Sequence, residues 1–270
     1  MFFVPATWLN GAMSTHWADE YLKRIGTPRP ARASLGALRE LQLAHLHTVP
    51  FENLSVHLGE PVILDQAALI RKIVQRRRGG FCYELNAAFA ALLTELGFQV
   101  STLSARVFNA EGQPGPPFDH LTLRVDLAAP WLVDVGYGRF ATRPVRLDTR
   151  DDQPGPDGTF QVTPSPSGHG ELDITHDGAP AYRIDPRPYQ LADFAPTCWW
   201  QCTCPETTFR RSLTCSISTP SGRVTLSGNR LITTENGQRT ERTLPGDPEI
   251  LTAYRTHFGI DLDQVPAVAP

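Results

Sequence analysis

The transition that decides the fold lies within residues 78–108, RGGFCYELNAAFAALLTELGFQVSTLSARVF. Residues 82–96 carry the apolar spacing of a helix, and Gly97 is placed to end it. Directly afterwards, residues 98–108 alternate and are rich in β-branched side chains, which is typical of a strand. Helices are therefore expected before this point and strands after it.

Helical patterns dominate the sequence before this transition. Apolar residues at helix spacing predict a helix that begins at Trp17 and ends at Gly26. Ser34 is placed to cap a second helix, which Pro50 stops. A third helix is predicted over 65–77, because an aspartate caps its start and its apolar residues follow the 3.6-residue period. Four helices are therefore expected in the first part of the chain.

Strand patterns dominate the remainder. The clearest strands are predicted at 120–127 and 130–138, whereas the polar, Pro- and Gly-rich stretch 148–167 predicts, at least in part, a mobile surface loop. Residues 215–244 predict three strands joined by turns, and residues 248–258 predict a short helix. Helices followed by strands, without regular alternation, favour an α+β fold over a βαβ sheet.

The composition is that of an ordinary globular protein, with 270 residues, 41% hydrophobic and 20% charged. A formal net charge of -3 argues against nucleic acid as the default partner, because duplex-binding proteins carry a basic surplus. No apolar run reaches the roughly 18 residues of a membrane helix. Five cysteines, an odd number, favour reduced thiols and a cytoplasmic protein over a disulfide scaffold. Residues 1–12 lack a signal-peptide pattern and are interpreted as an extension or an alternative start.

Cys82 is the first candidate for chemistry. It lies in the first turn of a predicted helix, where unpaired N–H groups and the helix dipole stabilise a thiolate. The same N–H groups are suited to stabilise an oxyanion on a substrate carbonyl. The preceding Gly79 and Gly80 would let a substrate approach the backbone. The alternative is a buried structural cysteine.

A nucleophilic cysteine needs a base and a group that orients the base. His120 opens one predicted strand, and Asp134 lies among apolar residues in the next. Adjacent antiparallel strands would bring the two side chains together, and a buried carboxylate is favoured by pairing with an imidazolium. Each residue alone has a structural alternative, a strand-end histidine and a turn-stabilising aspartate, so the hypothesis depends on the joint pattern.

Four blocks of the sequence resemble one known family. They are PFENLSVHLG (50–59), RGGFCYELN (78–86), DHLTLRVDL (119–127) and WLVDVGYG (131–138). Through them the chain resembles the arylamine N-acetyltransferases over about residues 13–244. The resemblance implies an α+β fold with a papain-like Cys-His-Asp core. Its parts would be a helical bundle with the nucleophile (1–97), an antiparallel β-barrel with the histidine and aspartate (98–200), and an α/β lid (201–270).

The resemblance also implies a reaction and a set of site residues. Cys82 would be the nucleophile, His120 the base and Asp134 the orienting acid in a ping-pong reaction. An acetyl group would pass from acetyl-CoA, through an acetyl-cysteine, to an arylamine or arylhydrazine, as in xenobiotic metabolism. Contacts with CoA are implied for Gly136, Gly138, Phe209 and Thr219, the last at the start of TPSGRVTLSGNR (219–230), and contacts with the acceptor for Phe51 and Phe140. For the glycines the alternative is a tight turn, and for Phe51 it is core packing.

The expected partners are small molecules, without a metal, a nucleic acid or a membrane, and the chain is expected to be a monomer or a weak homo-oligomer. An alternative function is a polyketide-releasing amide synthase that uses the same Cys-His-Asp triad. Two further alternatives are a papain-like protease or transglutaminase, and a binding module whose triad is inactive.

Three consecutive arginines, Arg76, Arg77 and Arg78, follow the third predicted helix. They resemble a phosphate site, and the alternative is a solvated helix C-terminus, which the helix dipole favours. We expect Arg78 to be structural and to form an ion pair with Glu52.

Four cysteines lie close together near the start of the predicted lid. They are Cys198, Cys202, Cys204 and Cys215. A zinc site is one interpretation, but the usual C-x2-C spacing is absent. The region is expected to be a strand, in which residues i and i+2 merely share a face, so reduced core thiols are the preferred interpretation.

Overall fold

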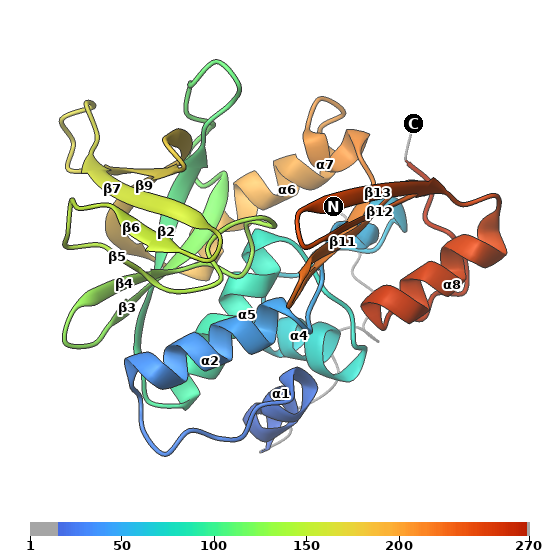
Figure 1. Ribbon diagram of the computed structural model, residues 1–270, viewed down its shortest axis with the longest axis horizontal. Coiled ribbons are helices and arrows are strands. Elements are labelled where there is room, and N and C mark those ends of the chain that lie inside the picture. Colours follow the sequence, from blue (N-terminus) through green and yellow to red (C-terminus); the bar gives the residue numbers. More distant parts are fainter. Residues whose placement is uncertain (1–15, 269–270) are drawn as a thin grey trace.

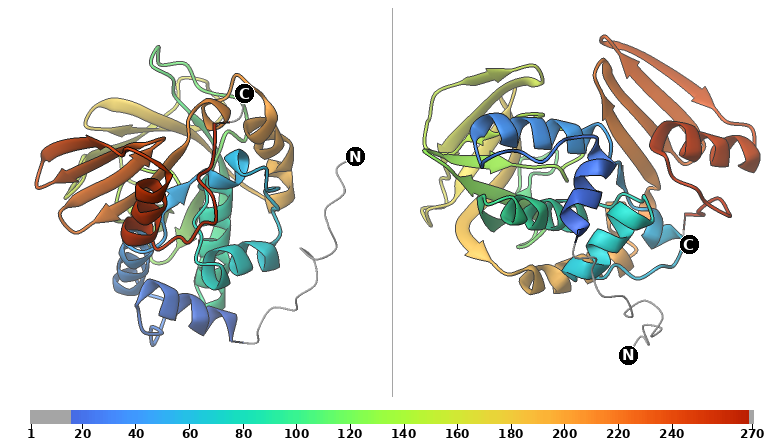
Figure 2. Two further views of the ribbon diagram at one scale, coloured as in Figure 1. Left: turned by 90° about the vertical axis from the view of Figure 1, so that its right-hand side faces the viewer. Right: turned by 90° about the horizontal axis from the view of Figure 1, so that it is seen from below.

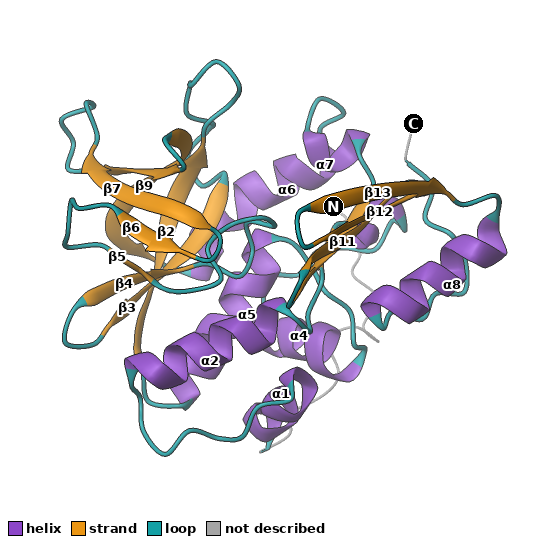
Figure 3. Cartoon of the chain, in the orientation of Figure 1, coloured by secondary structure: helices purple, strands orange, loops and turns teal. Residues whose placement is uncertain are grey.

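The computed structural model describes residues 16–268, and the predicted extension over 1–12 lies outside the described residues. In Figure 1 helices from the first part of the chain occupy the centre, a barrel of strands lies to the left, and a smaller sheet with helix α8 lies to the right. Figure 3 shows the two groups of strands on either side of the helices. The predicted α+β fold is confirmed.

The five predicted helices are present, and further helices that were not predicted occur between them. All helices of the described chain are α1 (Trp17–Ile25), α2 (Leu35–Leu46), α3 (Leu54–His57), α4 (Gln66–Ile70), the π-helix η2 (Arg71–Gln75), α5 (Cys82–Glu95), the 3-10 helix η3 (Leu191–Phe194), α6 (Ala195–Thr203), α7 (Thr208–Arg211) and α8 (Asp247–Phe258). Among those described, no helix is long and apolar enough to cross a membrane.

Local sequence explains where the first helices begin and end. Gly26 ends α1 with a left-handed backbone, φ 70°, as predicted for a helix C-cap. The Ser34 hydroxyl accepts a hydrogen bond from the N–H of Ala37 at 3.3 Å and caps α2. Asp65 caps α4 in the same way, but the predicted helix over 65–77 changes to a π-helix after Ile70. The helix positions were therefore predictable, whereas the change of helix type was not.

An antiparallel sheet of eight strands forms the nearly closed barrel, in the order β5-β4-β3-β2-β9-β8-β7-β6. The strands are β2 (Gln99–Val107), β3 (His120–Asp126), β4 (Pro130–Val133), β5 (Val145–Arg146), β6 (Gln153–Gly155), β7 (Gly158–Pro164), β8 (Leu172–His176) and β9 (Ala179–Tyr189). One prediction needs correction, because the strand predicted at 130–138 ends at Val133. Within the stretch 148–167, of which a part was predicted to be a loop, β6 and β7 form a hairpin, and Phe160 and Val162 alternate into the barrel core.

The second sheet contains β1 (Phe51–Glu52), β10 (Thr214–Thr219), β11 (Gly222–Ser227), β12 (Arg230–Glu235) and β13 (Gln238–Thr243), in the order β1-β10-β11-β12-β13. We call it the lid sheet. Residues 215–244 therefore hold four strands instead of the predicted three, because three turns join four strands. The predicted helix at the C-terminus is confirmed as α8, which Gly259 ends at φ 64°. Figure 2 shows the lid sheet and the barrel on opposite sides of the molecule.

The lid sheet also ties distant parts of the chain together. Its first strand, β1, comes from the N-terminal part and pairs with β10, so that Phe51 faces Ser216. Residue Phe51 also bridges to Gly80, just before α5. The lid sheet is therefore anchored directly beside the N-terminus of the helix that carries Cys82. The predicted boundaries at 97 and 200 stay predictions.

The cysteine-rich segment is helical, so the prediction of a strand there is wrong. Cys198 and Cys202 lie one turn apart on α6, whereas Cys215 lies on β10. Pro196 in the first turn favours a helix start, and burial of Cys198 and Gln201 follows helix spacing instead of alternation. All five cysteines of the chain are free thiols.

Candidate active site

Three elements bring Cys82, His120 and Asp134 together. Cys82 is the first residue of α5, His120 is the first residue of β3, and Asp134 directly follows β4. The Nε2 atom of His120 lies 2.6 Å from Oδ2 of Asp134, and the side chain of Cys82 contacts the same imidazole as a hydrogen-bonding partner. With Nε2 bound to Asp134, Nδ1 is the nitrogen left to face the thiol. All three side chains are buried.

The register of two strands explains how the histidine and the aspartate meet. Strands β3 and β4 are antiparallel, and Leu123 pairs with Val133. Continued by one residue, this register places Asp134 opposite Thr122 and diagonal to His120 on the same face. The sequence-based expectation that adjacent strands would bring the two side chains together agrees with this geometry.

The carboxylate of Asp134 accepts four hydrogen bonds. Its Oδ2 accepts from His120 and, at 3.1 Å, from the hydroxyl of Tyr182 on β9. Its Oδ1 accepts from Nδ2 of Asn86 and from the backbone N–H of Gly136, each at 2.9 Å. A buried carboxylate with four donors is compensated for its lost hydration and held in one orientation.

The charges of this group stabilise one another. Burial alone would lower the pKa of His120, but Asp134 and Cys82 outweigh burial and raise the pKa of His120 to about 10. Burial would raise the pKa of Asp134, but the imidazolium and the hydrogen bonds from His120, Asn86 and Gly136 lower it. At neutral pH this arrangement favours an imidazolium between the Asp134 carboxylate and the sulfur of Cys82.

Asn86 and Tyr83 fix helix α5 against the strands. The Nδ2 atom of Asn86 also donates to the carbonyl of Leu121 at 2.7 Å, and its Oδ1 accepts from the N–H of Val135 at 2.9 Å. The Tyr83 hydroxyl lies 2.8 Å from the carbonyl of Phe118, two residues before His120. Side-chain hydrogen bonds from α5 to the backbone in and next to β3 and β4 thus hold the three predicted residues together.

The glycines before and after Cys82 make room for the protein's own atoms. A Cβ at Gly79 would lie 1.9 Å from the carbonyl oxygen of Pro50, and one at Gly80 would collide with the side chain of Glu84. The expectation that these two glycines admit a substrate is therefore corrected. A Cβ at Gly136 would lie 2.6 Å from Cα of Cys82, so only glycine allows this approach.

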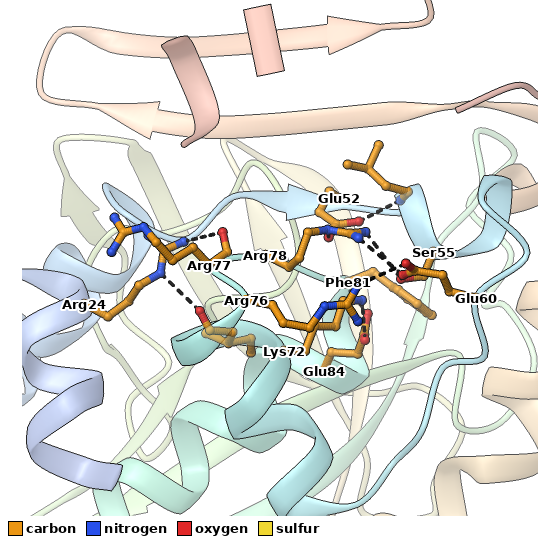
Figure 4. Close-up of polar contacts among 12 residues, drawn as sticks. Arg24, Glu52, Ser55, Glu60, Lys72, Arg76, Arg77, Arg78, Phe81 and Glu84 are labelled. Atoms are coloured by element: carbon orange, nitrogen blue, oxygen red, sulfur yellow. Dashed lines mark hydrogen bonds and ion pairs between the residues drawn. The ribbon is translucent and has the colours of Figure 1, made fainter. Parts of the chain in front are cut away.

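A buried ionic group supports the N-terminus of α5, and Figure 4 shows it in close-up. Arg78 donates through Nε to Glu52 at 3.0 Å, which confirms the predicted pair. The ammonium of Lys72 on η2 lies 2.6 Å from Glu84, whose other oxygen accepts from the N–H of Phe81, the residue before α5. These pairs fix both sides of the turn that leads to Cys82.

Carboxylates of the protein itself engage two residues of the arginine run. Arg78 pairs with Glu52 at 3.0 Å and with Glu60 at 3.3 Å, and Arg76 pairs with Glu60 at 3.0 Å. The carbonyl of Arg77, a residue with φ 51°, accepts a hydrogen bond from Arg24 on α1 at 3.0 Å. The interpretation of the run as a phosphate site is therefore not supported, because Arg76 and Arg78 already pair with Glu52 and Glu60.

Four side chains were predicted, besides two glycines, to contact CoA or the acceptor. Two of these side chains lie together near Cys82, and the other two lie elsewhere. The rings of Phe51 and Phe209 are 6.3 Å apart, and Phe209 is 4.8 Å from Phe81, which precedes Cys82. Phe140 is buried in the barrel core among other aromatic rings, and Thr219 lies at the β10–β11 turn. Within residues 16–268, no group of three or more His, Cys, Asp or Glu side chains is arranged to hold a metal ion.

Comparison with known proteins decides the family. The family model described as N-acetyltransferase matches residues 34–267. The chain belongs to the N-acetyltransferase family. A curated relative, the arylamine N-acetyltransferase of Mycolicibacterium smegmatis, is 34% identical over 250 residues, covering 90% of this chain and 91% of the relative. The arylamine N-acetyltransferase of Escherichia coli is 33% identical and covers 91% of this chain and 89% of the relative.

Solved structures agree with this assignment. The arylamine N-acetyltransferase from Salmonella typhimurium superposes with a TM-score of 0.85 at 29% identity, covering 96% of each chain. The Mycobacterium marinum enzyme in complex with CoA superposes with a TM-score of 0.81 at 29% identity, covering 90% of this chain and 92% of that one. The chain is therefore an acyltransferase with the predicted fold.

Two residues of this N-acetyltransferase site were missed by the sequence reasoning. Asn86 lies four residues after Cys82, so helix spacing places both on one face of α5, and this signal was available. Tyr182 lies on β9, 48 residues after Asp134, and no local pattern marks it. The first residue was accessible to sequence reasoning, whereas the second needed the barrel.

Proposed function

We propose that this enzyme transfers an acetyl group from acetyl-CoA to small arylamines or arylhydrazines through an acetyl-Cys82 intermediate. This proposal rests mainly on one observation, which is that the His120 imidazole contacts Asp134 on one side and Cys82 on the other. The names of the relatives support the acceptor class, and the CoA complex of the Mycobacterium marinum enzyme supports the donor.

The first half of the reaction forms the acyl-enzyme. The Cys82 thiolate attacks the thioester carbonyl of acetyl-CoA and forms a new C–S bond. The N–H groups at the start of α5 face the developing oxyanion. The bond between the carbonyl carbon and the CoA sulfur then breaks, and the proton on Nδ1 of His120 passes to that sulfur, so that free CoA leaves.

The second half of the reaction transfers the acetyl group. The amine nitrogen attacks the carbonyl of acetyl-Cys82, and neutral His120 takes the proton that the nitrogen loses. The C–S bond to Cys82 breaks, and the ion pair is restored while Asp134 keeps the imidazole oriented. Aromatic amines suit this step because their low basicity leaves the nitrogen unprotonated at neutral pH.

We assign the substrate contacts with the same reasoning. Phe51 and Phe209 form an aromatic wall beside the start of α5, where an aryl acceptor and the pantetheine arm would pass. Gly138, with φ 93° and only the Phe51 ring near its missing Cβ, leaves open space for CoA. Gly136 would contribute its backbone, and Phe140 and Thr219 remain predicted contacts. A cytoplasmic location also stays a prediction.

The experiment is an assay of free CoA with purified protein, acetyl-CoA and a panel of anilines and hydrazines. We expect CoA release that depends on the amine, and none from Cys82→Ser. Cys198→Ser is the matched control, because it removes a buried thiol outside the proposed triad. Amine-independent release, or turnover by Cys82→Ser, would contradict the proposal. Turnover of long acyl thioesters but not acetyl-CoA would favour the polyketide-releasing amide synthase, which no present observation favours.

A further inference from the structure

The three residues before His120 form a turn whose backbone is strained at one position. Phe118 has φ 62°, in the left-handed region that residues with a Cβ disfavour. A residue in such a conformation persists only where its surroundings hold it, and these residues concentrate at functional sites. The turn 117–119 leads directly into β3, so its shape determines where the backbone of His120 lies. The contacts that hold this turn therefore bear on the proposed base.

Helix α5 and strand β2 both bind the backbone of this turn. The Tyr83 hydroxyl on α5 lies 2.8 Å from the carbonyl oxygen of Phe118 and 3.0 Å from that of Asp119, so its single hydrogen is shared between them. On β2, the Oγ atom of Ser104 accepts a hydrogen bond from the N–H of Phe118 at 3.1 Å. The strained residue is thus fixed from both of its sides.

Helix α6 supplies a contact to the side chain of the turn. The Nε2 atom of Gln201, a buried residue, donates to Oδ1 of Asp119 at 2.6 Å. One helical turn earlier, the Thr197 hydroxyl donates to the carbonyl oxygen of Pro117 at 3.1 Å. Residues i and i+4 lie on the same side of a helix, so both contacts come from one face of α6. This face holds the turn at both ends.

The carboxylate of Asp119 is half-buried and depends on uncharged donors. Within residues 16–268, no Lys, Arg or His side chain lies within ion-pair distance of it. Its Oδ2 accepts a longer hydrogen bond, from the N–H of Val107 at 3.3 Å. Burial raises the pKa of Asp119, against the hydrogen bond from Val107 and the charge of His120. Loss of the Gln201 amide would leave this carboxylate poorly compensated for its lost hydration.

We propose that Asp119 and Gln201 are positioning residues of the reaction, because their hydrogen bond fixes α6 to the turn from which His120 projects. This bond keeps the imidazole directed toward Cys82. The inference rests on the proposed function. Asp134 binds the ring itself, whereas α6 fixes the backbone that carries the ring. A displacement of about 1 Å at a reacting group can cost about 10²-fold in rate.

The test reverses the hydrogen bond without changing the total charge of the pair. Gln201→Glu sets two carboxylates against each other and should break the contact. The double variant Asp119→Asn/Gln201→Glu should restore it, because the asparagine amide would donate to the introduced carboxylate while its oxygen accepts from Val107. Gln201→Met removes the donor without adding a charge. Gln238→Glu, which adds the same charge at an exposed position of the lid sheet, is the matched control.

The first measurement is the rate at which iodoacetamide alkylates Cys82, followed over a range of pH by mass spectrometry of the peptide that contains it. In Gln201→Glu and Gln201→Met we expect the rate at neutral pH to fall and the profile to move to higher pH, because a displaced imidazolium no longer stabilises the thiolate. The double variant and Gln238→Glu should keep the wild-type profile. A contact that served the fold alone would not move this profile.

The second measurement is kcat/KM for acetyl-CoA in the assay of free CoA. We expect a fall of about 10²-fold in Gln201→Glu and recovery of most of this loss in the double variant. Melting temperatures are measured alongside. If Gln201→Glu does not fold, the comparison of Gln201→Met with the double variant takes its place.

Two results would overturn the positioning role. The pH profile of Cys82 alkylation could stay that of the wild type in both folded single variants of Gln201. Alternatively, the double variant could react no faster than Gln201→Glu, which would show that the loss does not come from the hydrogen bond. Alkylation needs neither an amine nor CoA, so a wild type that releases no CoA with any amine would refute the proposed function separately.

Discussion

Two buried groups of charged side chains lie against α5, the ionic group around Arg78 and the proposed triad around His120. They differ in the groups that these two cations contact. In the ionic group behind the helix, every nitrogen of Arg78 that donates is directed to Glu52, Glu60 or Ser55. In the proposed triad, His120 gives one nitrogen to Asp134 and the other to Cys82. The first cation is bound entirely by the protein, whereas the second keeps one side for a group that reacts.

This difference separates a structural role from a chemical one. Both groups are buried, so both depend on pairing to offset the loss of hydration. Arg78 holds β1 to the turn before α5, so its removal should mainly lower the free energy of unfolding. Asp134 fixes the charge and orientation of the His120 imidazole, so its removal should mainly lower the rate of turnover.

The largest effect is expected for Asp134→Asn. Asparagine keeps the shape of the side chain but cannot balance the imidazolium or hold the same tautomer of His120. We expect kcat/KM for amine-dependent CoA release to fall by about 10³–10⁴. Asp126→Asn is the matched control, since it removes a half-exposed carboxylate on the same strand pair, bound to Arg124. Activity of Asp134→Asn within tenfold of the wild type would refute the assigned role.

The next effect is expected for the ionic group. Arg78→Gln and Glu52→Gln should each lower the free energy of unfolding by about 3–5 kcal/mol, because each removes one partner of a buried ion pair. The double variant should cost less than the sum, as a double-mutant cycle from urea unfolding would show. Arg29→Gln, in an exposed pair with Asp19, should cost about 0–1 kcal/mol. Equal melting temperatures for Arg78→Gln and the wild type would exclude the structural role.

The comparison also shows which contacts sequence reasoning reaches. The pair Arg78–Glu52 and the three residues of the proposed triad were predicted, because short motifs and their spacing mark them. Asn86 shares a helix face with Cys82 and was within reach. Tyr182 was not, because its contact with Asp134 depends on the pairing of β9 with β2, which in turn pairs with β3 in the barrel.

The fold shows the same limit at a local scale. Caps such as Ser34 and Gly26 were predicted, because their chemistry acts within a few residues. The segment around Cys198 was misassigned, since a short run of cysteine and tryptophan suits a strand and a helix equally. The glycines at 79 and 80 were assigned to substrate access, although the neighbours that require them, Pro50 and Glu84, are visible only in three dimensions.

The smallest effect, a change of stability with pH, tests whether the imidazole is charged. Asp134 and Cys82 outweigh burial and raise the pKa of His120 to about 10, whereas the unfolded chain has the ordinary value of about 6.5. A raised pKa stabilises the fold fully below about pH 6.5, and this contribution is lost as the pH rises through about 10. The pKa of Asp134 is lowered, so its contribution is lost only in acid.

The test compares Cys82→Ser with Cys82→Ser/His120→Gln, so that the cysteine sulfur takes no part in the proton balance. Their melting temperatures are measured at intervals from pH 6 to about 10. We expect the advantage of Cys82→Ser to shrink across this window, because only this variant binds the extra proton on His120 in its folded state. Adding Asp126→Asn to Cys82→Ser should leave this pH dependence unchanged, since Asp126 does not contact His120. An advantage that stays constant with pH would mean that Asp134 does not hold the imidazole in its charged form. The imidazole would then act as a base that must first remove the thiol proton. His120 and Arg78 would in that case differ in their resting charge as well as in the groups that they contact.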